Sequence, residues 1–295
     1  MGEFNISFSK INSKTLSSNI SGSQISNNSP SGVSIFSADE LPDDKPKALT
    51  KEEIKAEKKR LKQEEKAEKK RISTIPDGII QGGKQGSTAG DCWLLAEMNS
   101  MAKTDWGKEA FKKAIFVGDN GDYIVHFKGV NKDILITKKE FEKAQKDSDY
   151  SSNDADALLY EIAVERHFQN EKINNGSIKG NDLAGEDSLQ YLLTGHKGRQ
   201  TQNIKEMEIV LKAMGANQEN NNEISATYIY HDNNPENTGD IDHAMSIQQV
   251  ILDNNGNLDK IIVLDSYHPD KPKTLSYKSL KNNIKLFGYV TSPKK

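Results

Sequence analysis

The chain has 295 residues, of which 34% are hydrophobic and 28% charged, and its formal net charge is −3 at neutral pH. This polar composition predicts that part of the chain is solvated, and the small net charge gives no basic excess that would favour nucleic acid. One cysteine excludes an intramolecular disulfide and a cysteine-rich zinc site. No stretch is apolar over the length that a membrane-spanning helix needs.

Two N-terminal segments differ from the rest of the chain. Residues 1–45 are rich in Ser and Asn with isolated Ile, which predicts a disordered leader. Residues 46–75 contain KEEIKAEKKRLKQEEKAEKKR, which predicts a solvated charged helix, a linker or an inhibitory pro-segment. Its Glu residues cancel its Lys and Arg residues, so it does not favour nucleic acid either.

Helical patterns dominate the next part of the chain. A helix is predicted over 92–103, with Asp91 as its N-cap and with Leu94, Met98 and Met101 on one apolar face. Further predictions follow in chain order: a helix and a hairpin turning at 119–121, a capping box from Thr137 to Glu140, a buried helix over 155–168, and helices over 186–193 and 203–215.

Strand patterns take over after residue 222. Residues 223–231 alternate, 243–252 and 260–267 flank an Asn-Asn-Gly turn, and 285–292 form a last strand. Helices followed by strands predict an α+β fold with a helical lobe over 76–195 and a β-rich lobe over 196–295. We expect a functional site where such lobes meet.

Cys92 lies behind a Gly-containing loop at the start of the helix predicted over 92–103. A helix N-terminus favours the thiolate, which is the nucleophilic form of cysteine. The backbone N–H of Cys92 and the side-chain amide of Gln85 could then bind a developing oxyanion. The alternative is that Cys92 is a small buried hydrophobe beside Trp93.

The stretch Gln85-Gly-Ser-Thr-Ala-Gly-Asp-Cys-Trp-Leu-Leu-Ala96 resembles the active-site segment of calpain-type cysteine proteases, Gln-Gly-x-x-Gly-Asp-Cys-Trp-Leu-Leu-Ala. Gln85 lies one residue further from Cys92 than that pattern has it. Either the loop bulges, or Gln81 or a backbone group serves the oxyanion.

A nucleophilic cysteine needs a base, and the chain has six histidines. His243 opens an apolar strand after a polar loop, and Asp242-His-Ala-Met-Ser246 resembles the calpain segment Gly-His-Ala-Tyr-Ser. Asp265, near the end of the next strand, is expected to orient the imidazole by accepting its Nδ1 proton. The family has Asn here, followed by Ser-Trp or Pro-Trp, so Asp265 adds a buried charge and Tyr267 takes the place of the shielding Trp.

The resemblance covers residues 76–295 and implies a papain-like, two-lobed cysteine protease domain. It implies hydrolysis of peptide bonds in a protein or peptide substrate through Cys92, His243 and Asp265, with an acyl-enzyme intermediate. The chemistry needs no cofactor. Calcium binding stays open, because loops 232–242 and 253–259 are rich in oxygen ligands but match no EF-hand. We expect a monomer.

Two rival functions share these residues. The same triad could transfer acyl groups from glutamine side chains, as a transglutaminase or deamidase does. The chain could also be a non-catalytic interaction module on a protease fold. The N-terminus lacks an apolar secretory signal, which predicts a cytoplasmic protein or one exported without a cleaved apolar signal. The leader resembles those of bacterial effectors, or it could be a pro-segment removed by self-cleavage within 71–78.

Overall fold

The computed structural model describes residues 55, 58–60, 62–63, 75–86, 90–147, 149–150, 154–180, 185–216, 223–231 and 242–292. The leader predicted over 1–45 lies outside the described residues. So does most of the segment 46–75, of which residues 58–60 and 62–63 are helical and exposed. Within the described part, no helix combines the length and the apolar character needed to cross a membrane.

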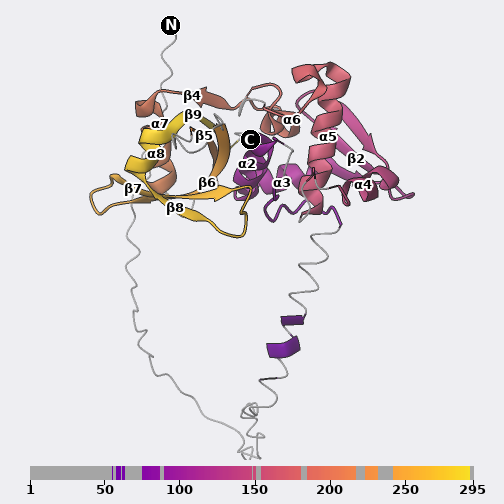
Figure 1. Ribbon diagram of the computed structural model, residues 1–295, viewed down its shortest axis with the longest axis horizontal. Helices are drawn as coiled ribbons and strands as arrows, with labels where there is room; N and C mark the ends of the chain where they lie inside the picture. The colour runs from indigo at the N-terminus through magenta and orange to yellow at the C-terminus, as the bar shows by residue number, and fades with distance from the viewer. Residues whose placement is uncertain are drawn as a thin grey trace, which may run out of the picture. The chain divides into compact units, whose positions relative to one another are not determined.

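The described fold is mixed α+β, with a helical region followed by a sheet region (Figure 1). The helical region consists of α2 (Cys92–Ala102), α3 (Asp105–Ala114), α4 (Lys138–Ala144), α5 (Ala155–Glu171), the 3-10 helix η1 (Ile173–Gly176) and α6 (Leu189–Thr194). It also holds a small antiparallel sheet in the order β1-β2-β3, formed by Ile115–Val117, Tyr123–Phe127 and Lys132–Ile136.

The sheet region is an antiparallel sheet of six strands in the order β4-β9-β5-β6-β7-β8. Its strands are β4 (Arg199–Thr201), β5 (Ile224–His231), β6 (Asp242–Leu252), β7 (Leu258–Asp265), β8 (Lys273–Ser276) and β9 (Ile284–Thr291). Helices α7 (Ile204–Ala216) and α8 (Tyr277–Asn283) pack their apolar residues with those of the sheet in a second core, which includes Leu211, Leu280 and Val263.

Helix α2 connects the two regions and lies between the large sheet and α5 in Figure 1. Leu94, Met98 and Met101 are buried as expected, but burial extends to every residue from Trp93 to Met101. The buried polar side chains find partners in three places: Glu97 accepts from the N–H of Leu189 at the start of α6, Asn99 accepts from the N–H of Gly83, and Ser100 bonds the sheet region. The Ser100 hydroxyl donates to the Ala226 carbonyl at 2.9 Å and accepts from the Ala226 N–H at 2.7 Å, which fixes α2 against β5.

Two buried carboxylates at the start of α5 hold the segment that leads to Cys92. Asp154 caps α5 by accepting from the N–H groups of Asp156 and Ala157, and it also accepts from the N–H of Gln81. Asp156 accepts from the N–H of Gly78 at 2.6 Å, and burial raises its pKa to about 7. Segment 75–86 is therefore attached to α5, which no local pattern in the sequence indicates.

Most of the predicted elements are confirmed, including the hairpin at 119–121 and both hydrogen bonds of the Thr137–Glu140 capping box. The capping role of Asp91 is wrong: it stands at the N-cap position of α2, but its side chain makes no capping hydrogen bond and is fully buried. The sequence analysis did not predict β3, β4, β8 or α8, which are all short.

Candidate active site

Cys92 is the first residue of α2 and is partly buried, so its thiol is not sealed in the core. Its Sγ accepts a hydrogen bond from the backbone N–H of Ala244 at 3.5 Å. Ala244 is the third residue of β6 and belongs to the same buried cluster as α2. The sulfur therefore lies where the helix start meets β6, next to the strand residue that follows His243.

His243 lies beside that sulfur and is 7% exposed. Its Nε2 donates to Oδ1 of Asp265 at 2.9 Å. Burial lowers the pKa of His243, but hydrogen bonds to Asp265 and Cys92 and their negative charges raise that pKa to about 9. The imidazolium form is therefore favoured at neutral pH, as a thiolate–imidazolium pair requires.

Asp265 ends β7, and the pairing of β6 with β7 brings it to the histidine. In that register Met245 pairs with Asp265, two residues after His243. Burial raises the pKa of Asp265, but hydrogen bonds from His243, Lys273 and the Tyr267 N–H hold that pKa well below its ordinary value. Asp265 is therefore a carboxylate at neutral pH.

The tautomer expected from the sequence is wrong. Asp265 accepts from Nε2 of His243, not from Nδ1. Nδ1 is then the ring nitrogen that Asp265 does not hold, and the sulfur of Cys92 interacts with the backbone of β6 one residue further on, at Ala244.

Gln85 is buried and lies beside the same strand end. Its backbone N–H donates to the Ser266 carbonyl at 2.9 Å, and its Oε1 accepts from the Ser266 hydroxyl at 3.0 Å. With Oε1 held in this way, the amide group can present its N–H donors elsewhere. Gln81, the alternative donor, is exposed, and its backbone is bonded to Asp154 instead. The loop residues 87–89, where a bulge was expected, lie outside the described residues.

The ring of Tyr267 stacks on the ring of His243, with centroids 4.9 Å apart and an interplanar angle of 20°. Tyr267 is 40% exposed, so one face of its ring covers the imidazole and the other meets solvent. The sequence expectation that Tyr267 takes the place of a shielding Trp is consistent with this contact.

Sequence reasoning missed three residues around this site. Lys273 pairs with Asp265, Ser266 holds Gln85, and Glu161 on α5 lies by Asp91, the residue before Cys92. Burial raises the pKa of Asp91, and contacts with Glu161 and Lys179 oppose this rise. No local pattern could have found these residues, because each acts across a tertiary contact.

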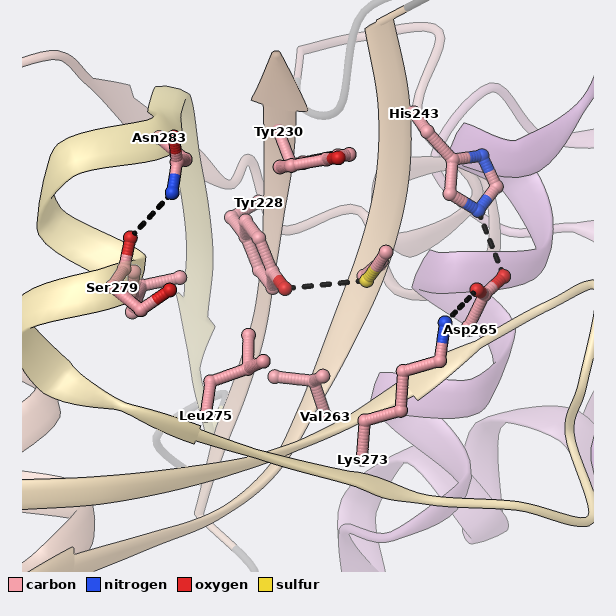
Figure 2. A pocket seen from close by; sticks show the side chains of 11 residues that line it. Tyr228, Tyr230, His243, Val263, Asp265, Lys273, Leu275, Ser279 and Asn283 are labelled. Atoms are coloured by element: carbon pink, nitrogen blue, oxygen red, sulfur yellow. Dashed lines mark hydrogen bonds and ion pairs between the residues drawn. The ribbon is translucent and has the colours of Figure 1, made fainter. Parts of the chain in front are cut away.

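A cavity of about 360 Å³ borders the histidine on the side of the sheet (Figure 2). Its wall combines apolar side chains with Tyr228, Tyr230, Asp265 and Lys273. Figure 2 shows His243 and Lys273 reaching the same carboxylate from two directions.

The described residues contain no cluster of three or more His, Cys, Asp or Glu side chains placed to bind a metal ion. In the turn after β6, Asp253 accepts from the N–H groups of Asn255 and Asn257, so its carboxylate stabilises the turn. In the other oxygen-rich loop, residues 232–241 lie outside the described part.

No protein-family model matches the chain, and no curated protein matches it significantly. The case for a function therefore depends on the geometry around Cys92.

Proposed function

We propose that the chain is an enzyme of the cysteine-nucleophile class, which transfers an acyl group through a thioester with Cys92. Within that class we propose a calpain-like endopeptidase with a papain-like fold, in which His243 is the general base and acid and Asp265 orients it. The observation that carries the proposal is the setting of His243: Asp265 holds its Nε2, and the N–H of the next residue, Ala244, donates to the sulfur of Cys92.

The proposed reaction starts from the thiolate of Cys92 and the imidazolium of His243. The sulfur attacks the scissile carbonyl carbon, and the carbonyl oxygen becomes an oxyanion that the Gln85 amide and the N–H of Cys92 can stabilise. His243 then gives its proton to the leaving amine, and the C–N bond breaks. This leaves an acyl group on Cys92 and a neutral imidazole.

Deacylation reverses the role of the imidazole. Neutral His243 takes a proton from water, the hydroxide attacks the thioester carbonyl, and the thiolate leaves as the carboxylic product forms. Asp265 keeps the ring in one orientation through both steps, because its Oδ1 holds Nε2 while Nδ1 exchanges the proton.

Unbiased N-terminal profiling of a proteome tests the proposal. Extracts are incubated with the wild-type chain, with Cys92→Ala and with His243→Asn, and new N-termini are identified by mass spectrometry. We expect new termini with wild type and none above background with either variant, provided that all three proteins show the same circular dichroism. Equal sets of termini in the three samples would refute a peptidase.

The acyl acceptor separates a peptidase from the rival transglutaminase or deamidase. Glutamine-containing peptides are incubated with the enzyme, with and without a fluorescent primary amine. We expect cleavage of the backbone and no change at glutamine. Amine incorporation, or a mass gain of one dalton without cleavage, would instead favour side-chain acyl transfer.

Self-processing is a part of the proposal that the chain itself can test. We propose cleavage within residues 71–78, a range whose last residue, Gly78, is already bonded to Asp156. Intact-mass measurement of purified wild type and Cys92→Ala should show a shorter wild-type chain. Identical N-termini in both proteins would discard self-processing without affecting cleavage of other substrates.

A further inference from the structure

The third member of the proposed triad carries a charge that the resembled family does not have. Asn in that position is neutral, whereas Asp265 is 5% exposed and ionised. A buried carboxylate is costly unless it is paired and hydrogen-bonded, and it also strengthens the hold of an imidazole on its proton. An imidazolium that holds its proton too strongly is a poor acid for the leaving amine.

Every oxygen of Asp265 has a donor. Oδ1 accepts from Nε2 of His243 at 2.9 Å and from the N–H of Tyr267 at 3.0 Å. Oδ2 accepts from Nζ of Lys273 at 2.8 Å. Lys273 is the first residue of β8 and pairs with Val263 of β7. The hairpin between the two strands therefore brings the side chain of Lys273 next to the carboxylate of Asp265.

Asp265 and Lys273 are buried to different extents. The Asp265 side chain is 7% exposed, whereas the Lys273 side chain is 48% exposed. The ammonium group of Lys273 can therefore keep part of its hydration, whereas the buried carboxylate of Asp265 cannot. Because of this, the lysine avoids most of the desolvation cost that usually weakens a buried ion pair. Figure 2 shows the side chain of Lys273 extending along the cavity lining to the carboxylate of Asp265.

We propose that Lys273 is a positioning residue that compensates part of the charge of Asp265, in the place where the resembled family uses a neutral amide. The Lys273–Asp265 pair orients Nε2 of His243 with less negative charge beside the imidazole than a lone carboxylate would place there. The inference rests on the proposed function for its catalytic meaning, but the electrostatic effect exists in the folded chain whether or not it cleaves peptides.

The other groups around His243 do not replace Lys273. The Cys92 thiol and the Asp265 carboxylate bond the imidazole, and the neutral ring of Tyr267 stacks on it. Tyr228 lines the same cavity, and burial raises its pKa, so it stays neutral. The adjacent Asp242 is already engaged with Lys285 and His231.

The proposal predicts a change in the titration of His243 that a purely structural lysine would not cause. In Lys273→Met, the uncompensated carboxylate should raise the pKa of His243 by about one unit. The shift is followed by NMR of the His243 ring proton, assigned by its loss in His243→Asn. Lys273→Gln, which can still donate to Asp265 but has no charge, should give a similar rise, and Lys273→Arg should restore the wild-type titration.

Two controls make the result specific. Lys271→Met removes an exposed lysine from the same hairpin and should leave the titration unchanged. The double variant Lys273→Met/Asp265→Asn replaces a neutral pair by a neutral amide, so it should titrate near the wild type or below it. If Lys273→Met does not fold, the Gln and double variants decide the question.

A His243 titration that stays unchanged or falls in the folded Lys273→Met and Lys273→Gln variants would overturn the proposal. The proposal would also be overturned if the pKa of His243 in the double variant rose as far as in Lys273→Met. In peptide hydrolysis we expect kcat to fall severalfold in Lys273→Met. The alkaline limb of the pH profile of kcat should move to higher pH. Loss of peptidase activity in every form, with the NMR shifts as predicted, would refute the peptidase and leave the charge compensation standing.

Discussion

His243 and Asp265, 22 residues apart, are joined by a hydrogen bond of 2.9 Å between Nε2 and Oδ1. Both side chains lie at the ends of neighbouring strands, where β6 begins and β7 finishes. Cys92, which belongs to another region of the fold, accepts from the N–H of the next strand residue, Ala244. The start of α2, the start of β6 and the end of β7 therefore bring the three residues to one place.

Gln85 should matter to the rate of acylation. In Gln85→Ala the amide donor is lost, and we expect kcat to fall about a hundredfold with little change in KM, since an oxyanion forms only in the transition state. Gln85→Glu keeps an acceptor for the Ser266 hydroxyl but puts a carboxylate near the oxyanion, so its kcat should fall at least as far. Steady-state kinetics on a cleaved peptide measure both. Gln81→Ala is the matched control, and a large loss of kcat there instead would reassign the donor.

The stacking of Tyr267 on His243 should protect the bond between His243 and Asp265 from water. Removal of the ring in Tyr267→Ala should lower kcat/KM about threefold to tenfold, which corresponds to the usual worth of an aromatic pair. Tyr267→Phe keeps the ring and should retain most of the activity. Equal losses in the two variants would show that the hydroxyl, and not the ring, carries the effect.

The raised pKa of His243 makes the stability of the fold depend on pH. The unfolded pKa is near 6.5 and the folded pKa about 9, so the proton on His243 stabilises the fold fully below pH 6.5 and this stabilisation is lost as the pH rises to 9. We expect the wild type to lose roughly 2 to 3 kcal/mol relative to His243→Asn over that range. Denaturant unfolding at pH 6.5, 7.5 and 9 measures the difference.

The comparison with His243→Asn cancels the other groups that titrate in the same range, such as Asp156, with a pKa of about 7, and Lys103, with a pKa of about 8, both shifted by burial. A constant difference between the two proteins from pH 6.5 to 9 would contradict the coupling of His243 to Asp265 and Cys92.

Ser100 should hold α2 against the sheet region. Ser100→Ala leaves both the N–H and the carbonyl of buried Ala226 without this partner, and we expect a loss of about 2 kcal/mol in the free energy of unfolding. Ser225→Ala removes only the hydroxyl that donates to Ser100, so it should cost less. Urea unfolding compares the two variants. A larger loss in Ser225→Ala would mean that the attachment depends on another contact.

Elements set by neighbouring residues could be predicted from the sequence. The Thr137–Glu140 box, the hairpin at 119–121 and the turn after β6 each depend on side chains or turn residues a few positions apart. Burial could not be predicted in the same way. Three residues of α2 were expected on one apolar face, but its polar residues are buried too, because Leu189 on α6, Gly83 and Ala226 on β5 supply their partners.

The same distinction applies to the candidate site: some of it could be predicted from local sequence, and the rest depends on tertiary contacts. The resemblance of residues 85–96 and 242–246 to calpain segments, together with a helix start, a strand start and a strand end, selected Cys92, His243 and Asp265 as candidates, because such termini have local signatures. Only the tertiary structure decided which nitrogen of His243 meets Asp265, that Ser266 holds Gln85, and that Lys273 neutralises the carboxylate. Charge and hydrogen-bond pairing depend on distance in space, and strand pairing brings together groups that no spacing along the chain relates.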